Sequence, residues 1–410
     1  MNSIFLPELS ELENDTLLYL HDGSYNSRSL LAIDSESSFS GSGNDPDVFR
    51  KAQAWIDEQN DHIMVAISYD LKNSIETLHT RHPDRISFPD LFLFVPRLLA
   101  AIEKGEIDWI KGGDAAEKQK IESLLLASPQ EVRPTGAVLK PRIERAVYLN
   151  ELEKVLRHIQ RGDIYEMNYC QEFYLENQEI HPFSTYRRLH ELTQAPFSVF
   201  FRHQNSYLLC GSPERYLKKE GSKLISQPIK GTVRRGTTPE EDAELIAHLS
   251  NDEKERAENI MITDLVRNDM SRSALPGTVQ VEELCGIYTF KTVHQMISTV
   301  TSELSEETTF TQLLKDTFPM GSMTGAPKVS AMQIIDTLEH SRRGLYSGSV
   351  GYLSPEGDFD LNVVIRSLLY NSESHYLSAM VGGAITALSN PEKEYEECLL
   401  KADALFKALC

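Results

Sequence analysis

The sequence lacks a long hydrophobic run and has few cysteines. No stretch of about 18 apolar residues occurs in its 410 residues, so no membrane-spanning helix is predicted. The 5 cysteines are scattered and never form a C-x-x-C pair, which argues against a zinc site or a disulfide framework. This pattern is typical of reduced thiols in a cytoplasm. The N-terminal segment carries acidic residues where a secretory signal would carry basic ones, so export is not expected.

Basic residues are outnumbered by acidic ones. The chain has 41 Lys and Arg against 61 Asp and Glu, a net charge of −20, which argues against binding to nucleic acid. The field of such a protein repels an anionic substrate. Any anion site must therefore be built from local cations, backbone amides or a bound metal.

The order of predicted elements indicates an α+β protein. Apolar stretches at 62–71 and 88–99 read as strands, and residues 101–140 read as a polar connection between two lobes. Further along, helices are predicted from about 142 to Gly162, from Thr238 to Leu249, over 252–268 with Asn251 as its cap, from Ala326-Pro327 to Leu338, and from Asn390 almost to Cys410. Strands are predicted at 348–354, 360–370 and 375–385. Because helices and strands do not alternate regularly, antiparallel sheets are expected.

Two predicted helices each carry a pair of glutamates three residues apart. The pairs are Glu255 with Glu258 and Glu394 with Glu397, and this spacing puts both carboxylates of a pair on one helix face. Two such faces opposed would form an oxygen-rich pocket for a hard cation such as Mg²⁺. The same spacing is typical of the solvated faces of acidic helices, and alone it does not decide between the two.

Lys230 lies in SQPIKGTVRRG (226–236), where a predicted strand enters a loop. It is either an ordinary surface lysine or a functional amine. A nucleophilic lysine must be neutral, so burial or nearby cations must lower its pKa. The glycine-rich segment FPMGSMTGAPK (318–328) is either a turn or an anion site at the start of a helix, and it lacks the spacing of a P-loop.

Two further residues have a structural and a functional interpretation. Arg366, in a predicted apolar strand, needs a buried partner, which could be a protein carboxylate or a substrate carboxylate. His294 could be a hydrogen-bonded core histidine or an acid–base catalyst. Tyr346 and Gly382–Gly383 are compatible with both interpretations.

Seven segments between about residues 140 and 410 occur in the order found in one family. They are SPERYL (212–217), PIKGTVRRG (228–236), ENIMITDLVRND (258–269), GSMTGAPKVSAMQIID (321–336), RRGLYSGSVGY (342–352), NVVIRSLL (362–369) and EYEECLLKADAL (394–405). Through them the sequence resembles the component I family of anthranilate synthase and aminodeoxychorismate synthase, within the chorismate-utilising enzymes. The first third of the chain matches mainly through SYDLKNSIE (68–76).

The resemblance implies a fold of two large antiparallel β-sheets packed as a sandwich and flanked by helices. It implies that residues 1–135 contribute strands to the sandwich and that residues 140–410 form the chorismate-binding catalytic region. It also implies that the active site lies between the two sheets.

The resemblance assigns roles to the candidate residues. It implies that Glu258 and Glu397 bind Mg²⁺, with Glu255 and Glu394 acting through metal-bound water. It implies that Thr232 and Ser322 line the substrate site, and that the carboxylate of the enolpyruvyl arm is held by Tyr346, Arg366, Gly382 and Gly383. Glu214 matches the family's general acid, and His294 matches its active-site histidine. The metal and Arg366 would then neutralise a dianionic substrate.

Lys230 separates two activities within the family. The resemblance implies that members with Pro-Ile-Lys-Gly-Thr convert chorismate and ammonia to 4-amino-4-deoxychorismate, the precursor of 4-aminobenzoate and folate. Anthranilate synthases usually carry Ala in place of this lysine, and anthranilate synthesis is the alternative. The chemistry explains the lysine: its addition at C2 expels the 4-hydroxyl, and ammonia then adds at C4 and expels the lysine.

Glu166, in GDIYEMN (162–168), departs from the family pattern. Aminating members usually carry Gln at this position and isochorismate synthases carry a water-activating Lys, so water is not the expected nucleophile. Glu166 could bind an incoming ammonium ion. No nucleophile-elbow cysteine of a glutaminase is recognisable, so the resemblance implies a separate glutamine amidotransferase subunit that supplies ammonia. A non-catalytic chorismate-binding subunit would be expected to lack one of the catalytic or metal-binding residues, yet Glu214, Lys230, Glu258 and Glu397 are all present.

Overall fold

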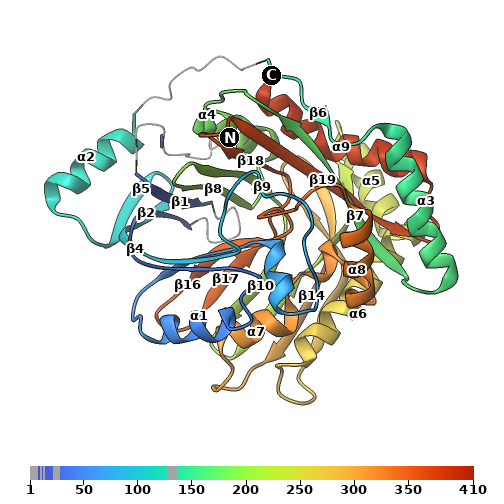
Figure 1. The fold of residues 1–410 in the computed structure, drawn as a ribbon, viewed down its shortest axis with the longest axis horizontal. Helices are drawn as coiled ribbons and strands as arrows, with labels where there is room; N and C mark the ends of the chain where they lie inside the picture. The colour runs from blue at the N-terminus through green and yellow to red at the C-terminus, as the bar shows by residue number, and fades with distance from the viewer. Residues whose placement is uncertain (1–7, 10–11, 13, 22–27, 128–135) are drawn as a thin grey trace.

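The computed structural model describes residues 8–9, 12, 14–21, 28–127 and 136–410 (Figure 1). Its α-helices are α1 (Val48–Asp57), α2 (Ala115–Leu125), α3 (Arg145–Arg161), α4 (Pro182–Thr193), α5 (Pro239–Asn251), α6 (Glu253–Ser271), α7 (Phe310–Thr317), α8 (Lys328–Leu338) and α9 (Pro391–Leu409). Two 3₁₀ helices, η1 (Tyr69–Ser74) and η2 (Gly321–Met323), occur in connections. Over these described residues, every helix is too short or too polar to cross a membrane.

The strands form one hydrogen-bonded network in which the pairings are antiparallel. The strands of the first third are β1 (Thr16–Leu20), β2 (Arg28–Gly41), β3 (Ile63–Ile67), β4 (Leu91–Glu103), β5 (Glu106–Lys111) and β6 (Lys140–Pro141). The middle of the chain supplies β7 (Glu166–Leu175), β8 (Phe197–His203), β9 (Ser206–Ser212), β10 (Arg215–Glu220), β11 (Lys223–Gln227), β12 (Ile229–Arg234), β13 (Gln280–Thr289) and β14 (Val293–Glu303). The last strands are β15 (Gly325–Ala326), β16 (Ser349–Leu353), β17 (Phe359–Asn362), β18 (Ser367–Asn371) and β19 (Tyr376–Thr386).

The network folds over on itself to make two facing limbs. One limb runs through β13, β14, β11, β10, β17, β16, β3 and β4. The other runs through β2, β1, β8, β9, β18, β19 and β7. The long pairing of β2 with β4 joins them. The expected α+β sandwich is confirmed, with the difference that hydrogen bonds join its two sheets into one.

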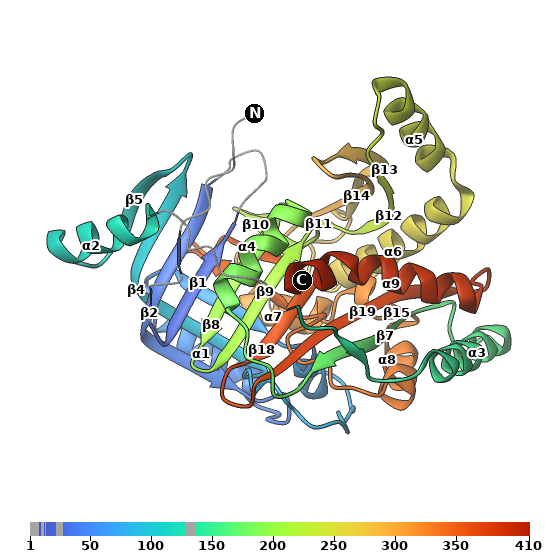
Figure 2. The ribbon, with the colours of Figure 1, turned by 90° about the horizontal axis from the view of Figure 1, so that it is seen from above.

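Two hydrophobic cores account for this arrangement. The inner core lies between the limbs and takes Val65 and Val350 from one limb and Phe201 and Met380 from the other. The outer core includes Phe200 and lies between the second limb and the helices α3, α4, α8 and α9. Neighbouring residues of a strand point to opposite faces, so one strand supplies both cores. Figure 2 shows α4 and α9 side by side over β9, β18 and β19.

Local signals placed most helix ends correctly. Gly162 ends α3 in the left-handed conformation with φ 81°, and the Thr238 side chain accepts a hydrogen bond from the Glu241 amide at the start of α5. Asn390 caps α9 in the same way. The cap of α6 is Asp252 and not the expected Asn251, because the Asp252 side chain is the one that accepts from the Glu255 amide.

Two expected elements are different in the structure. Residues 101–140 are not simply a connection, since they contain the end of β4, all of β5, α2 and the start of β6. Residues 128–135 of that predicted connection lie outside the described residues. The strand expected over 360–370 is broken into β17 and β18, and Arg366 lies in the break with φ 52°.

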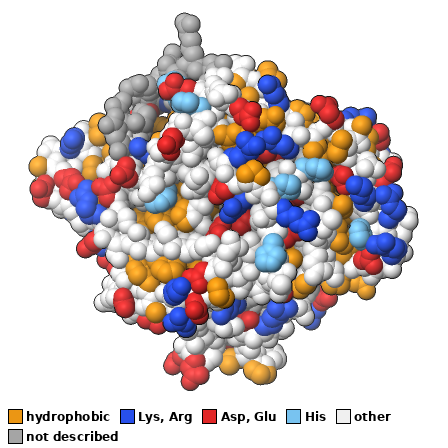
Figure 3. All heavy atoms as spheres, in the orientation of Figure 1, with side chains coloured by type: hydrophobic (Ala, Val, Ile, Leu, Met, Phe, Trp, Pro, Cys, Tyr) orange, Lys and Arg blue, Asp and Glu red, His pale blue; other side chains and the backbone are white. Residues whose placement is uncertain are grey.

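The charges of the surface are mixed. Figure 3 shows acidic and basic side chains interspersed over one face of the molecule, with histidines among them. The net charge of −20 is therefore not concentrated on that face.

Candidate active site

Lys230 lies at the centre of a group of carboxylates. The register of β12 with β14 shifts between Ile229 and Thr232, so Lys230 occupies an irregularity at which the strand bends. Its side chain is 12% exposed, and Nζ lies 3.2 Å from Oε1 of Glu166, the first residue of β7. Glu166 itself is buried. The sequence predicted Lys230 as a functional amine and left Glu166 without a partner, and the fold brings the two together.

The expectation that burial or nearby cations lower the pKa of Lys230 is not met. Burial does pull the pKa of Lys230 down, but the carboxylates of Glu166, Glu258 and Glu214 outweigh burial and raise it above the ordinary value. The resting amine is therefore protonated. Before it can act as a nucleophile, it has to lose a proton to a nearby group.

Glu214 is placed to donate a proton. It lies just before β10, is 5% exposed, and has its pKa raised by burial to about 7. Hydrogen bonds from the Ser322 side chain and the Ile229 amide, together with the charge of Lys230, oppose that rise. A carboxyl group that is still protonated near neutral pH is suited to general-acid catalysis.

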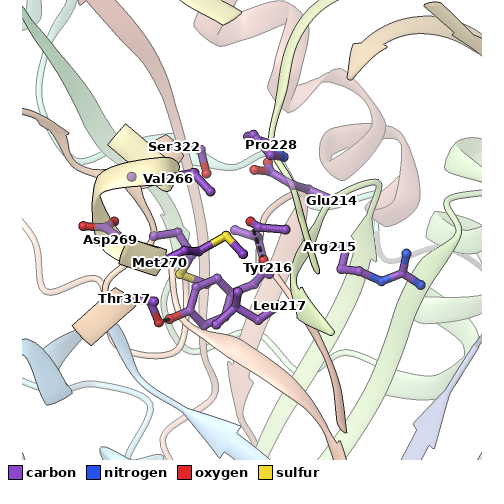
Figure 4. A pocket seen from close by; sticks show the side chains of 14 residues that line it. Glu214, Arg215, Tyr216, Leu217, Pro228, Val266, Asp269, Met270, Thr317 and Ser322 are labelled. Carbon is purple, nitrogen blue, oxygen red and sulfur yellow. Dashed lines mark hydrogen bonds between the residues drawn. The ribbon is translucent and has the colours of Figure 1, made fainter. Parts of the chain in front are cut away.

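Glu214 and Ser322, which lies on the 3₁₀ helix η2, both line one cavity (Figure 4). Its remaining lining includes Pro228, Val266 and Met270, and the Tyr216 hydroxyl bonds to Thr317 at 2.6 Å on one side of it. The apolar lining is the cause of the poor solvation of Glu214.

The four predicted metal-binding glutamates lie on α6 and α9, and Lys254 links the two helices. Nζ of Lys254 is 3.7 Å from Glu258 and 3.5 Å from Glu394. Glu258 and Glu394 are buried, whereas the Glu397 side chain is 44% exposed and is paired with Lys401. Burial raises the pKa of Glu258 to about 7, with Lys230 and Lys254 opposing the rise. Burial, followed by the charge of Glu397, also raises the pKa of Glu255.

These residues fit a magnesium ion. Oε1 of Glu258 is buried and has no hydrogen-bond partner among the described residues. A lysine ammonium already lies between carboxylates of the two helices, which is where a cation is attracted. In the described part of the chain no three His, Cys, Asp or Glu side chains converge tightly enough to hold a metal by themselves. Mg²⁺ typically takes one or two carboxylates and completes its shell with water and substrate oxygens, so the donor set agrees with its preferences.

A second group of residues can hold a substrate carboxylate. Arg366 has no carboxylate within salt-bridge distance in the described part of the chain, and its guanidinium donates to the carbonyl of Lys401 at 3.0 Å. Burial lowers the pKa of Arg366, while Tyr346 and Glu397 oppose that shift. Lys401 donates to the carbonyl of Gly382 at 3.3 Å. A Cβ at Gly382 would lie 2.5 Å from the Cys170 sulfur, so glycine at this position allows β19 to lie close to β7.

His294 does not join this group. Its ring is fully buried, with Nε2 2.8 Å from Asp242 and Nδ1 2.9 Å from Thr289. In the pairing of β12 with β14, Val233 is opposite His294 and Thr232 is opposite Gln295. Adjacent strand residues point to opposite faces, so the predicted catalytic role of His294 conflicts with its position on the face opposite to Thr232.

Three site residues were missed in the sequence. Gln295 is 5% exposed, and its Oε1 has no hydrogen-bond partner among the described residues. Lys254 lies four residues before Glu258, and Lys401 lies four residues after Glu397. The helical i, i+4 spacing was the available signal for both lysines. Gln295 could be found only from the strand register.

The comparisons with known proteins agree with the fold. The chorismate binding enzyme family matches residues 18–407, and the chain belongs to this family. The chain is 36% identical to aminodeoxychorismate synthase component 1 of Escherichia coli over 344 residues, which cover 83% of this chain and 75% of that protein. It is 42% identical to the chloroplastic aminodeoxychorismate synthase of Arabidopsis thaliana over 267 residues, 64% of this chain.

The plant protein is much longer, and the matched region spans only 29% of its length. Among solved structures, anthranilate synthase component I from Streptococcus pneumoniae superposes with a TM-score of 0.80 and 26% identity, covering 92% of both chains. The similarity therefore extends to members with both of the activities that the sequence left open.

Proposed function

We propose that this chain replaces the 4-hydroxyl group of chorismate with an amino group and forms 4-amino-4-deoxychorismate. The observation that carries the proposal is the side chain of Lys230, which is 12% exposed, 3.2 Å from Glu166 and electrostatically coupled to Glu214 and Glu258. A lysine in this position is a nucleophile that a water-adding enzyme does not need. Relatives in Escherichia coli and Arabidopsis thaliana carry the name aminodeoxychorismate synthase, which supports the same activity.

In the proposed reaction, the amine of Lys230 adds to C2 of the ring. The ring double bonds shift, the C4–O bond breaks, and Glu214 gives its proton to the departing hydroxyl group, which leaves as water. Ammonia then adds at C4, the double bonds shift back, and the C2–N bond to the lysine breaks. Arg366 and Lys401 would hold a substrate carboxylate, and Thr232 and Ser322 would line the site.

Glu258 and Glu397 would hold Mg²⁺ directly, and Glu255 and Glu394 would act through its water. The ion would supply positive charge at the ring carboxylate, where electron density gathers as the lysine adds. This charge would also offset the net charge of −20 that repels the substrate. The ammonia would come from a separate glutamine amidotransferase subunit, a proposal supported by the name component 1 of the Escherichia coli relative.

The test is to identify the product after the purified chain is incubated with chorismate, Mg²⁺ and an ammonium salt. Mass spectrometry should show a product in which the hydroxyl group is replaced by an amine and the enolpyruvyl arm is kept. Anthranilate with release of pyruvate would show that the chain is an anthranilate synthase instead. The Lys230→Ala variant should lose the amination while binding Mg²⁺ at least as tightly as the wild type, because a cation near Glu258 is removed, and isothermal titration calorimetry would measure the affinity.

A further inference from the structure

Nζ of Lys230, the proposed nucleophile, lies 3.2 Å from one carboxylate, and its raised pKa favours the protonated amine. Five carboxylates influence the Lys230 site: Glu166 from β7, Glu214 before β10, Glu255 and Glu258 from α6, and Glu397 from α9. Of these, Glu166 is the one that lies in direct contact with Nζ, at 3.2 Å. A proton acceptor has to be within about this distance of the donor.

The other nearby carboxylates have other partners. Glu214 is hydrogen-bonded by the Ser322 side chain and the Ile229 amide, and its proposed role requires it to give a proton. Glu258 is paired with Lys254 of the same helix, and Lys254 also contacts Glu394 on α9. Glu166 has neither the role of proton donor nor a place at the predicted cation site.

The backbone holds Glu166 in a fixed position. It pairs with Ala326 of β15 on one side and with Thr386 of β19 on the other. Any Cβ at Gly325 would lie 2.2 Å from the carbonyl oxygen of Glu166, so the two chains are in close contact. Glu166 is therefore a buried carboxylate at the start of β7, and its backbone is paired with a strand on each side.

We propose that Glu166 is the catalytic base that takes the proton from Lys230 before the lysine adds to the ring. This step adds the proton acceptor to the proposed amination reaction and rests on that proposed function. The proton passes from Nζ to Oε1 of Glu166, and the freed lone pair forms the bond to C2. When ammonia has added at C4 and the C2–N bond breaks, the electron pair returns to Nζ and Glu166 gives the proton back. Glu214 regains its proton from the new ammonium group at C4.

This role differs from the binding of an incoming ammonium ion by Glu166. The carboxylate is already paired with the ammonium of Lys230 in the resting structure. A role as base acts before ammonia arrives, whereas a role in ammonium binding acts after it. A reaction without ammonia therefore distinguishes the role as a base from the role in ammonium binding.

The experiment measures the lysine adduct in the absence of ammonia. Wild type and Glu166→Gln are mixed with chorismate and Mg²⁺, quenched at short times, and analysed by intact-protein mass spectrometry for a species heavier by chorismate minus water. Formation of the adduct by Glu166→Gln should be slower by about 10²- to 10⁴-fold near neutral pH, the usual contribution of a general base. Glu166→Asp, which keeps the carboxylate at a longer reach, should fall between the two.

The pH dependence separates a base from a structural residue. Loss of the Glu214 proton above about pH 7 slows adduct formation in both proteins alike, so the informative quantity is the ratio of the wild-type rate to the Glu166→Gln rate. In the wild type the proton moves within the pair, whereas in Glu166→Gln it must leave to solvent, so this ratio should fall about tenfold per pH unit. A slow variant whose rate keeps a constant ratio to the wild-type rate at every pH would overturn the proposal, because the defect would then not be in deprotonation.

Two controls complete the test. Glu172→Gln removes another buried, cation-paired carboxylate from β7, where Glu172 is 3.0 Å from Arg142, and it should form the adduct at the wild-type rate. If Glu166→Gln forms the adduct at a rate within threefold of the wild-type rate but turns over slowly with ammonia, Glu166 acts in ammonium binding and the proposal is wrong. If the wild type makes the amino product without any adduct at Lys230, the covalent route itself is wrong, and the proposal with it. If the wild type makes no amino product at all, the proposed function has failed instead.

Discussion

The imidazole of His294 on β14 is hydrogen-bonded to the carboxylate of Asp242 on α5, with 2.8 Å between Nε2 and Oδ1. The other ring nitrogen contacts Thr289, and the ring is fully buried. This arrangement fastens α5 to the sheet. We therefore expect His294→Asn to lower the free energy of unfolding by about 1–3 kcal/mol, the cost of leaving buried polar partners unpaired, and to change kcat by less than about threefold.

Urea denaturation and steady-state kinetics of the same preparations would measure both effects. The exposed His248 on α5 offers a control, since His248→Asn should change neither quantity. A large loss of kcat in a fully folded His294→Asn protein would show that His294 takes part in catalysis.

The elements that carry the site could be predicted largely from local patterns. The cap at Thr238, the end of α3 at Gly162 and the start of α9 at Asn390 each depend on residues within one turn. The i, i+3 spacing likewise put Glu255 and Glu258 on one helix face without knowledge of the fold.

Long-range pairing could not be predicted in the same way. Glu166 and Lys230 are 64 positions apart in the chain, and only the strand network brings them within 3.2 Å. The raised pKa of Lys230 follows from that pairing, so the sequence suggested the opposite direction. The choice between His294 and Gln295 depends on strand register, where a shift of one residue reverses the face of every side chain.

The pH profile of the reaction should report Glu214. As a general acid it must be protonated, and its pKa is raised to about 7, so kcat/KM should fall as the pH rises through about 7. The hydrogen bond from Ser322 holds this pKa down. Ser322→Ala should therefore move the alkaline limb to higher pH by about half a unit to one unit, the equivalent of one hydrogen bond.

Ser226→Ala is the matched control for this shift. Ser226 lines the same cavity, but its hydroxyl donates to the carbonyl of Tyr216 and not to Glu214. The alkaline limb of the kcat/KM profile of Ser226→Ala should lie at the same pH as in the wild type. A limb that moves equally in both variants would show that cavity packing, and not the Ser322 hydrogen bond, sets the pKa.

Lys254 should compete with Mg²⁺ for the carboxylates of α6 and α9. Its ammonium lies 3.7 Å from Glu258 and 3.5 Å from Glu394, and its side chain is 37% exposed. Because such half-exposed pairs are worth about 0.2–1 kcal/mol each, loss of both in Lys254→Met should tighten Mg²⁺ binding by about two- to thirtyfold. Isothermal titration calorimetry without chorismate measures this directly. Lys407→Met, which removes a lysine from an exposed pair on the same α9, should leave the affinity unchanged.

Arg366 should bind a substrate carboxylate through its planar fork of donors. It lies in the break between β17 and β18 with φ 52°, a backbone conformation that Lys adopts at the same cost, so Arg366→Lys tests the side chain alone. Lysine keeps the charge but loses bidentate hydrogen bonding, and a charged hydrogen bond is worth about 1.5–3 kcal/mol. KM for chorismate should therefore rise by about 10- to 150-fold while the melting temperature stays within a degree or two. Arg157→Lys, on the exposed side of α3, should leave KM unchanged. An unchanged KM in Arg366→Lys would mean that the backbone amides of Gly382 and Gly383 hold the carboxylate without the guanidinium.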